Sequence, residues 1–559
     1  MSDNDSDRHH TTPVRPDFFD DEGHAISPPR PRRWLAVGES LLILLVMFLH
    51  GASLPPDLNE VHYLGKAKHY WAPTWCPGDF FLDTADAHQV FYWTFGWLTL
   101  DRWELSFTQI AWIGRLATWA LLAVAWRRLS WALVPRPAMA VASAVVFLAL
   151  VQRCHMAGEW VVGGVEAKGF AYALVLLGLG SLVQRAWRTA IVLMGAAAAF
   201  HVLVGGWSIV ALAFAWLLLR NRSAPSLVSL LPAAFVGAAL CAPSVVFALR
   251  LDWHADAATV AAANAIYVYE RLPHHLVLSG MKPEFVIRFA MLIAVGVGLA
   301  FAVRRTVAVQ NLLAFCAGAV AIAIVGVALS SAAEFAPEAM ASVLRYYWFR
   351  LADVVVPLGV ALLVVLRIGQ TLERNAVRGS YLAAALFVLC VVHLGELLYE
   401  RRPGTEFARH APADAKSKVV IDGKAVVAAD DWQAVCLFFH NHPGILPSAK
   451  VLTPRNSHSF KWYAEQPEVG TWKDIPQDAA NIVEWMDRMR TIHANRDATK
   501  PERQWSRTLA DLGKHELIRV ARKYGAEYVI AESQPPLALP QMYSNRSYVV
   551  YKIPPELPP

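Results

Sequence analysis

The sequence predicts an α-helical polytopic membrane protein of about eleven transmembrane helices, with a C-terminal extracytoplasmic domain of α/β or α+β type. Hydrophobic residues make up 56% of its 559 residues, and charged residues only 17%. Apolar stretches long enough to cross a hydrocarbon core of roughly 30 Å recur through the first 400 residues. The 21 Trp fit a chain with membrane interfaces, and the last apolar stretch is followed by a polar segment.

The transmembrane helices are predicted from these apolar stretches, and their orientation is predicted from the Lys and Arg of the short loops. The spans are 34–53, 105–126, 137–153, 169–184, 189–204, 206–219, 226–249, 286–303, 309–330, 351–367 and 380–398. Basic clusters fall in alternate loops, and cytoplasmic loops carry the excess of positive charge. The N-terminus is therefore expected in the cytoplasm and the C-terminal domain outside, with the chain most simply placed in the cell (inner) membrane.

The stretch 189–219 allows two assignments. This stretch is either one long helix or two short helices broken at Gly205-Gly206. We favour two helices, because only two leave Arg188 and Arg220 on the same side.

Three regions follow from this layout. Residues 1–33 are polar and aperiodic, which is typical of a disordered cytoplasmic tail. Residues 34–398 form the transmembrane domain, with a long first extracytoplasmic loop at 54–104. Residues 399–559 form the C-terminal domain. Its predicted strands are 418–421, 425–428, 527–531 and 548–553, and its predicted helices are 431–440 and 479–489.

Composition and motifs exclude several classes of function. The net charge of +6 is modest and the basic residues are dispersed, which argues against nucleic acid as a partner. No glycine-rich nucleotide-binding motif is present. The six Cys form no CxxC pair, and any pairing of Cys76, Cys154 and Cys436 stays open.

The first loop contains the strongest candidate for chemistry. Residues 59–71 have helical spacing, and the acids Asp57 and Glu60 stand at the start of that helix. A partly desolvated carboxylate there can act as a general base or as a metal ligand. The alternative is structural, with Asp57 capping the helix and Glu60 completing the capping pattern.

The string Asp57-Leu-Asn-Glu-Val-His-Tyr63, in a long loop after the first span, resembles the C-type superfamily of polyprenyl-phosphate-dependent multi-pass glycosyltransferases, which includes mannosyltransferase-like and oligosaccharyltransferase-like proteins. The segment from Glu166 to Tyr172 and the C-terminal domain are similar to the same superfamily. The resemblance implies that Glu60 is the general base, with Asp57 as a second candidate. Many members have a second acid where this chain has Asn59, so a divalent metal stays open and no cofactor is certain.

Arg345 and Arg350 flank an aromatic run just before the tenth span. A guanidinium presents a planar fork that suits phosphate oxygens, so both are candidates for binding the phosphate of a lipid-linked donor. The alternatives are contact with lipid headgroups and an ion pair between Arg350 and Asp353, three residues later.

Further polar residues in or beside the membrane are candidates for lining a substrate cavity, because isolated charges there are costly unless they are paired or face water. Structural alternatives apply to them: Glu166 and Lys168 can pair with each other or with Arg153, and a lone His is commonly a packed residue. The candidates are His62, Glu166, Lys168, His201, Arg271, His274 and His275.

The resulting functional hypothesis is the transfer of a sugar from a polyprenyl-phosphate carrier to an extracytoplasmic glycan, lipid or protein acceptor, with membrane lipid as a further partner. Two alternatives from other classes remain. One is a transporter for a lipid or solute, which should place charges near the midplane. The other is a non-catalytic scaffold or sensor that keeps the fold without the chemistry.

Overall fold

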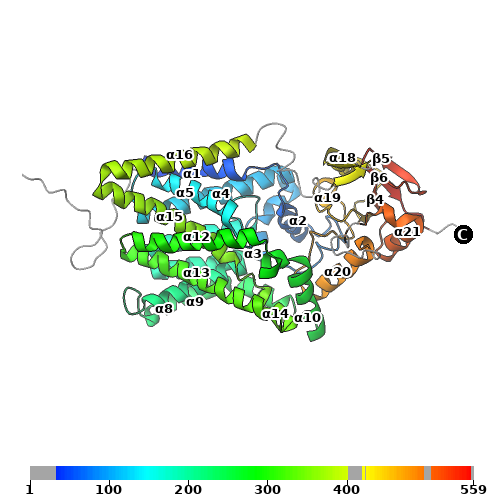
Figure 1. Ribbon diagram of the computed structural model, residues 1–559. Coiled ribbons are helices and arrows are strands. Elements are labelled where there is room, and N and C mark those ends of the chain that lie inside the picture. Colours follow the sequence, from blue (N-terminus) through cyan, green and yellow to red (C-terminus); the bar gives the residue numbers. More distant parts are fainter. Residues whose placement is uncertain are drawn as a thin grey trace, which may run out of the picture.

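The computed structural model describes residues 33–400, 418–421, 424–427, 429–495, 505 and 507–555. It consists of a bundle of long apolar helices and a C-terminal domain built around a small sheet, and Figure 1 shows the two side by side. The predicted fold class is therefore confirmed. The predicted N-terminal tail lies outside the described residues apart from Arg33, which begins the first helix.

Each predicted span coincides with a helix. Eight of the described helices are long and apolar enough to cross a membrane. These are α1 (Arg33–Gly51), α4 (Phe107–Leu133), α8 (Val202–Leu219), α9 (Leu227–Arg250), α12 (Pro283–Ala302), α13 (Val307–Ala332), α15 (Arg350–Arg374) and α16 (Ala376–Glu400). Three shorter apolar helices occupy the other spans: α5 (Met139–Cys154), α6 (Ala167–Val183) and α7 (Trp187–Phe200). Eleven crossings thus remain a prediction.

The segment 187–219 forms two helices, as the sequence favoured, but the break lies at His201 and not at Gly205-Gly206. Gly205 belongs to the first turns of α8, where this helix meets α7. A Cβ at position 205 would lie 2.0 Å from the backbone nitrogen of Ala198. Glycine is therefore needed here for close helix packing, and it does not end a helix.

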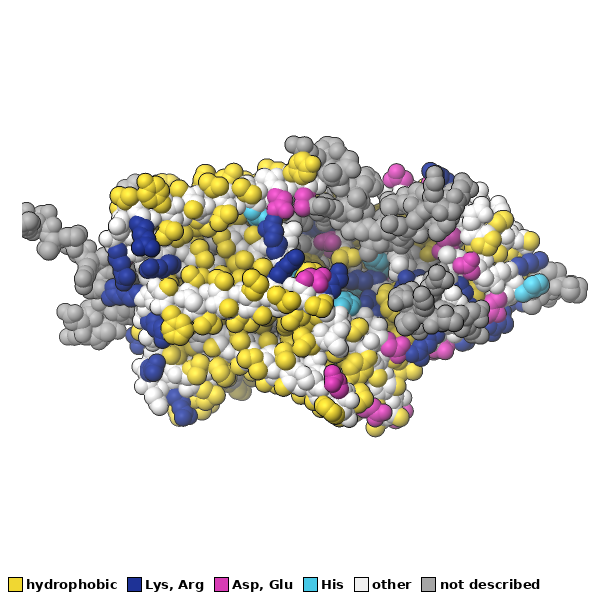
Figure 2. Space-filling view, viewed as in Figure 1, with side chains coloured by type: hydrophobic (Ala, Val, Ile, Leu, Met, Phe, Trp, Pro, Cys, Tyr) yellow, Lys and Arg dark blue, Asp and Glu magenta, His cyan; other side chains and the backbone are white. Residues whose placement is uncertain are grey.

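The basic clusters gather at the end of the bundle away from the C-terminal domain, where Figure 2 shows several Lys and Arg side chains. At this end Arg127 pairs with Glu39 of α1 at 3.1 Å, and Arg136 pairs with Glu373 of α15 at 3.0 Å. Apolar side chains cover the flank that Figure 2 shows. This distribution is what a bundle surrounded by lipid requires.

The opposite end of the bundle carries the first loop and several short helices. The loop contains α2 (Glu60–Trp71), α3 (Gln89–Thr94), η1 (Gly96–Thr99) and η2 (Asp101–Trp103), so the helix predicted at 59–71 is confirmed. Between α9 and α12 lie α10 (Ala257–Ala265), the π-helical turn η3 (Ile266–Arg271), α11 (Pro273–Leu276) and η4 (Leu278–Gly280). The short helix α14 (Pro337–Leu344) precedes α15.

The C-terminal domain combines a mixed sheet with helices. Strands β3 (Val451–Leu452), β4 (Tyr528–Glu532), β6 (Tyr548–Lys552) and β5 (Gln541–Ser544) form the sheet in that order, with β3 parallel to β4 and the other pairs antiparallel. Strands β1 (Lys418–Ile421) and β2 (Lys424–Val427) form a separate antiparallel pair. The helices are α18 (Ala429–Asn441), α19 (Phe460–Ala464), α20 (Ala479–His493), η6 (Ala510–Leu512) and α21 (Gly513–Lys523).

A buried group of charges, here called the docking cluster, joins the C-terminal domain to the first loop. Lys461 of α19 bonds Asp474 at 2.5 Å, contacts Glu468, and lies 3.7 Å from Asp79 of the first loop. His62 of α2 reaches Asp474 at 2.5 Å. Because buried charges are costly unless paired, this cluster fixes the loop and the domain in one arrangement.

Candidate functional site

Seven polar side chains meet at the end of the bundle that faces the C-terminal domain. They come from five separate parts of the chain: α2, the start of α3, the segment from α5 into α6, the break between α7 and α8, and the start of α15. We call them the polar cluster: Tyr63, His88, Glu159, Glu166, Lys168, His201 and Arg350.

Arg350 and Asp353 stand one turn apart on α15. The sequence allowed an ion pair between them, but the structure gives each a different partner. The Nε of Arg350 donates to Glu159 at 3.0 Å. The carboxylate of Asp353 accepts three backbone N–H groups, from Met156 at 2.7 Å, Ala157 at 2.8 Å and Glu159 at 3.2 Å. These three backbone N–H groups, and not Arg350, are thus the partners of the Asp353 carboxylate. As a result α15 holds Glu159 by both its backbone and its side chain.

Lys168 lies between two carboxylates. Its Nζ is 3.5 Å from Glu159 and 3.5 Å from Glu166, and it stands 3.7 Å above the ring of Trp160. The pairing of Glu166 with Lys168 that the sequence suggested is therefore present. Arg153, the other partner considered for them, pairs instead with Glu396 of α16.

Glu166 precedes α6 and is almost fully buried. Burial raises the pKa of Glu166, while Lys168 and the side-chain amide of Asn59, which donates to it at 2.7 Å, oppose the rise. In the sequence, Asn59 takes the place of a second acid that many members of the C-type superfamily have. A carboxylate at position 59 would repel Glu166, so the amide is matched to its partner.

His201 stands at the break between α7 and α8 with a hydrogen-bond donor on each side. The backbone N–H of Val204 donates to Nδ1 at 3.3 Å, which makes His201 the N-cap of α8. Its Nε2 lies 3.4 Å from Nη1 of Arg350. A neutral imidazole has one acceptor nitrogen, so when Nδ1 accepts, Nε2 carries a hydrogen and faces another donor. The N–H groups of His201 and Arg350 could both donate to one acceptor placed between them.

The acid–imidazole pair of Asp86 and His88 was not singled out from the sequence. Nδ1 of His88 lies 2.8 Å from Oδ1 of Asp86, and Nε2 lies 3.5 Å from the hydroxyl of Tyr63. The rings of His88 and His201 are 5.3 Å apart between centroids. The available signal was an acid two residues before a histidine in a loop already suspected of function.

Glu60, the predicted base, is fully buried and already engaged. Both of its oxygens accept from Arg115 of α4, at 2.6 Å each. The backbone N–H groups of Asp57 and Val165 donate to it at 2.7 and 2.9 Å. This geometry is that of a structural ion pair with half of a capping box. A hydroxyl could approach this carboxylate only if those bonds broke.

The second candidate base, Asp57, is half-buried beside Glu60. Its side chain accepts from the backbone of Leu58 at 2.7 Å and of Gly164 at 3.0 Å. It does not cap the start of α2, where Asn59 holds the capping position without a side-chain bond. Asp57 therefore links the first loop to the segment before α6.

The two candidate arginines lie in different surroundings. Arg350 belongs to the polar cluster, whereas Nη1 of Arg345 donates to Asp252 at 3.0 Å and to Asn264 at 2.7 Å. These contacts tie the end of α14 to α10 and the segment before it. The structure thus brings Arg350, and not Arg345, together with Glu166, Lys168 and His201.

The remaining candidate residues lie around the polar cluster. His62 belongs to the docking cluster, and burial lowers its pKa to about 4 against the opposing effect of Asp474. Arg271 donates to the backbone of Trp472 at 3.0 Å. His275 bonds the backbone oxygen of Ala157, and His274 is exposed beside it.

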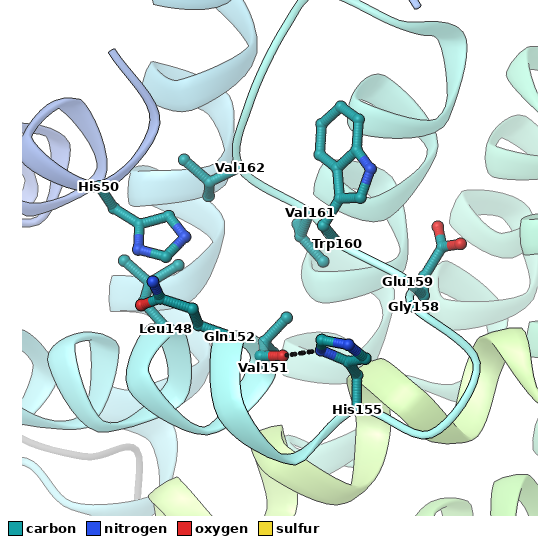
Figure 3. A pocket seen from close by; sticks show the side chains of 10 residues that line it. All are labelled: His50, Leu148, Val151, Gln152, His155, Gly158, Glu159, Trp160, Val161 and Val162. Atoms are coloured by element: carbon teal, nitrogen blue, oxygen red, sulfur yellow. Dashed lines mark hydrogen bonds between the residues drawn. The ribbon is translucent and has the colours of Figure 1, made fainter. Parts of the chain in front are cut away.

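A cavity of about 210 Å³ adjoins the polar cluster and is mostly apolar. Figure 3 shows its lining side chains, with His155 bonded to the Val151 backbone and Glu159 at one margin. The lining comes from the ends of α1 and α5 and from the segment that follows α5. It consists of His50, Leu148, Val151, Gln152, His155, Gly158, Glu159, Trp160, Val161 and Val162.

The residues in place do not suit a divalent metal. Among the described residues, no group of three or more His, Cys, Asp and Glu side chains is arranged to hold one. The oxygens of Glu60 are taken by Arg115, and Asn59 directs its amide nitrogen at Glu166. No disulfide joins any two cysteines of the described residues, which answers the open question of pairing for Cys76, Cys154 and Cys436 in this structure.

Of three comparisons with known proteins, two give matches. Residues 430–492, which include α19 and nearly all of α18 and α20, match a family described as a domain of unknown function, DUF6798. No curated protein matches the chain.

Two solved structures of oligosaccharyltransferase from Archaeoglobus fulgidus resemble the fold. One is the archaeal enzyme AglB in complex with an inhibitory peptide and a dolichol-phosphate, at 12% identity and a TM-score of 0.45, with 89% of this chain and 69% of that one covered. The other is a complex with Zn and sulfate, at 11% identity and a TM-score of 0.39, with 89% and 68% covered. These values describe a remote likeness, so the functional proposal rests on this chain's own residues.

Proposed function

We propose that this protein is a membrane glycosyltransferase that moves a sugar from a polyprenyl-phosphate donor to an acceptor at the end of the bundle that faces the C-terminal domain. The observation that carries the proposal is that Nη1 of Arg350 lies 3.4 Å from Nε2 of His201, a nitrogen that carries a hydrogen when Nδ1 accepts from Val204, and that the described residues place no acceptor between the two donors. An oxygen of a phosphate group, seated between them, would accept from both.

Arg350 is well placed for this role. Among the described residues, only Nε donates to an acceptor, Glu159, whereas Nη1 faces the N–H of His201. The side chain remains 13% exposed, and its guanidinium lies 3.9 Å from the centre of the Tyr347 ring. A positioned guanidinium with a spare donor suits a phosphate oxygen.

Lys168 adds a second cation at the same place. Its contacts to Glu159 and Glu166 are ion pairs at 3.5 Å, longer than ordinary hydrogen bonds, so its ammonium can turn towards a nearer anion. In sugar transfer the bond from the anomeric carbon to the phosphate oxygen breaks, and the phosphate leaves with the electron pair. Two fixed cations offset that growing charge.

The apolar cavity beside Glu159 and Trp160 complements the charged groups. A polyprenyl-phosphate joins a charged head to a long apolar chain, and the cavity and the polar cluster offer the two matching environments side by side. The polar cluster lies at the end of the bundle, whereas the polar groups of a transporter are expected near the midplane. Its position therefore favours a glycosyltransferase over a transporter.

Donor binding tests the proposal directly. The purified full-length chain in nanodiscs of phosphatidylglycerol and phosphatidylcholine is titrated with a short-chain polyprenyl phosphate, and the dissociation constant is measured. Arg350→Gln should weaken binding by about 10- to 100-fold, the scale of one lost charge-assisted contact.

Arg136→Gln is the matched control, because Arg136 forms an ion pair with Glu373 at the other end of the bundle. It should leave the dissociation constant unchanged. The proposal fails if the wild-type chain does not bind the lipid phosphate, or if the two variants bind it equally well.

A further inference from the structure

The pair of Asp86 and His88 is a second chemical element beside the donor site, and no role described so far uses it. Both side chains are mostly buried, with 8% of Asp86 and 15% of His88 exposed. Asp86 accepts twice from His88, through the backbone N–H at 2.6 Å and through ring Nδ1 at 2.8 Å. The acid therefore fixes both the position and the rotation of the imidazole.

The surroundings also fix which nitrogen carries the proton. An ionised carboxylate only accepts, so in the neutral ring of His88 the hydrogen lies on Nδ1 and Nε2 keeps its lone pair. That lone pair lies 3.5 Å from the Tyr63 hydroxyl. Burial and the nearby Glu166 and Asp86 carboxylates raise the pKa of Tyr63 well above its ordinary value, so Tyr63 stays a donor.

The ring of His88 lies beside the groups assigned to the donor. The His88 ring is 5.3 Å from the ring of His201, which in turn contacts Arg350. A hydroxyl that displaced the long Tyr63 contact would therefore have a base on one side and the donor site on the other. This is the arrangement that general base catalysis requires.

The C-terminal domain completes the pair. Gln477, just before the N-cap of α20, donates through Nε2 to the second oxygen of Asp86 at 2.9 Å, and the same nitrogen lies 3.2 Å from Nδ1 of His88. Its Oε1 accepts from the backbone of Ala87 at 3.1 Å. One side chain of the C-terminal domain thus holds both the acid and the chain segment that carries the imidazole.

We propose that His88 is the general base of the sugar transfer, with Asp86 and Gln477 as its positioning residues. This inference rests on the proposed function. Nε2 of His88 takes the proton of an acceptor hydroxyl. At the same time the oxygen of that hydroxyl bonds to the anomeric carbon of the donor sugar. The bond from that carbon to the phosphate oxygen breaks, and the phosphate leaves with the electron pair, beside Arg350 and His201.

The same loop contains a matched pair that lacks this capacity. His69 lies 3.0 Å from Asp83 through Nε2 and 2.9 Å from the backbone oxygen of Trp75 through Nδ1. Both of its ring nitrogens are therefore engaged, and Asp83 is 49% exposed. His69 and Asp83 are thus the same two residue types as His88 and Asp86, but neither ring nitrogen of His69 is available as a base.

The test measures turnover by the full-length chain in nanodiscs, with a polyprenyl-phosphate-linked hexose as donor and an alkyl hexoside as hydroxyl probe. His88→Ala should lower kcat by about 10²- to 10⁴-fold, the usual contribution of a general base. Added imidazole should restore part of that loss, which a purely structural defect would not allow. His69→Ala should keep kcat within about threefold of the wild type and show no response to imidazole.

A second set of variants guards against a folding defect. His88→Asn keeps a donor for Asp86 but lacks the ring lone pair, so it should fold as the wild type does and still lose turnover. Gln477→Leu should lower kcat and leave the dissociation constant for polyprenyl phosphate unchanged, and Gln477→Asn should recover part of the rate. Thermal unfolding of each variant reports on folding.

The outcomes separate this inference from the proposed function. If the wild type transfers the hexose and His88→Asn does so equally well, His88 is not the base, while the donor site stands. If the wild type neither binds the lipid phosphate nor consumes the donor, the proposed function fails and the base fails with it. Loss of turnover with intact lipid binding and imidazole rescue supports both.

Discussion

Glu60 illustrates how one residue supports different conclusions from sequence and from structure. In the sequence it is an acid that begins a helix beside the membrane, which suits a base. In the structure it forms a fully buried, two-bond ion pair with Arg115. Arg115 lies more than fifty positions further along the chain, so no local sequence pattern around Glu60 indicates this partner.

The structural reading of Glu60 predicts a stability effect. Glu60→Gln leaves the Arg115 guanidinium buried without a counter-charge, which should cost about 3–5 kcal/mol of unfolding free energy. Arg115→Met should cost a similar amount for the mirrored reason. The double variant should cost clearly less than the sum of the two, as measured by denaturant titration.

A catalytic Glu60 would give a different pattern. Glu60→Gln would then unfold like the wild type but lose turnover, and the double-mutant cycle would show no coupling. Asp83→Asn, at a half-exposed acid in the same loop, provides the control for effects of removing any charge from this region.

The residues that form the polar cluster could be predicted only in part. Glu166, Lys168, His201 and Arg350 were recognised because charged or titratable groups near a span stand out against apolar neighbours. Glu159 and His88 were not among the candidates, and Glu159 meets its partner Arg350 only through a contact between distant segments. Which of the candidate arginines belongs to the site depends on contacts between distant segments, and no local pattern carries that information.

Among the elements, the pair of α7 and α8 shows what limited the prediction of boundaries. A Gly-Gly pair favours a break, yet the helix ends at Phe200 and the next begins at Val202, with His201 as its cap. The two glycines have different surroundings. A Cβ on Gly205 would collide with the backbone of Ala198, whereas a Cβ on Gly206 has nothing within 4 Å.

This contrast predicts opposite effects for neighbouring substitutions. Gly205→Ala forces α7 and α8 apart and should destabilise the chain by about 1–3 kcal/mol, as overpacking does. Gly206→Ala should be neutral or stabilise by about 0.5–1 kcal/mol, because alanine favours a helix. Unfolding midpoints in detergent measure both, and equal midpoints would contradict the close packing at Gly205.

The elements themselves could largely be predicted, because each depends on local sequence. Apolar length marked the spans, and alternating patterns marked β4 and β6, each within a residue of its observed start. The short strands β3 and β5 and the helix α21 were not predicted. Two-residue and four-residue strands carry too little pattern, and α21 is amphipathic among polar neighbours.

At the scale of the whole molecule, the gathering of basic residues at one end predicts the orientation in the membrane. Cytoplasmic loops carry the excess of Lys and Arg, so the C-terminal domain should lie on the opposite side. With the six native cysteines replaced, a membrane-impermeant thiol reagent added outside intact cells should label His515→Cys. It should not label Asn221→Cys, in the loop between α8 and α9, until the cells are opened. The reverse labelling would overturn this orientation.

Two buried imidazoles, His62 of the first loop and His493 of α20, predict that the stability of the fold depends on pH. Burial lowers the pKa of His62 to about 4 and that of His493 to about 3, from an ordinary value near 6.5. Between those values the unfolded chain binds a proton that the folded chain does not. The stability that each neutral imidazole contributes is thus present above about pH 6.5 and is lost on acidification, by about 1.4 kcal/mol per pH unit.

Unfolding followed by tryptophan fluorescence between pH 4.5 and 7.5 checks this dependence. His62→Gln should flatten the loss of stability on acidification, whereas His440→Gln, at an exposed position, should leave it unchanged. A wild-type chain equally stable across the range would contradict the burial of these imidazoles.

The docking cluster also constrains how this protein can be rebuilt from parts. Lys461 and Asp474 come from the C-terminal domain, while Asp79 and His62 come from the first loop. A chimera that joined this bundle to the C-terminal domain of another protein would enclose a charge without its complement. The loop and the domain therefore behave as one exchangeable module, split in the sequence by the helices of the bundle, and a successful graft transfers both pieces together.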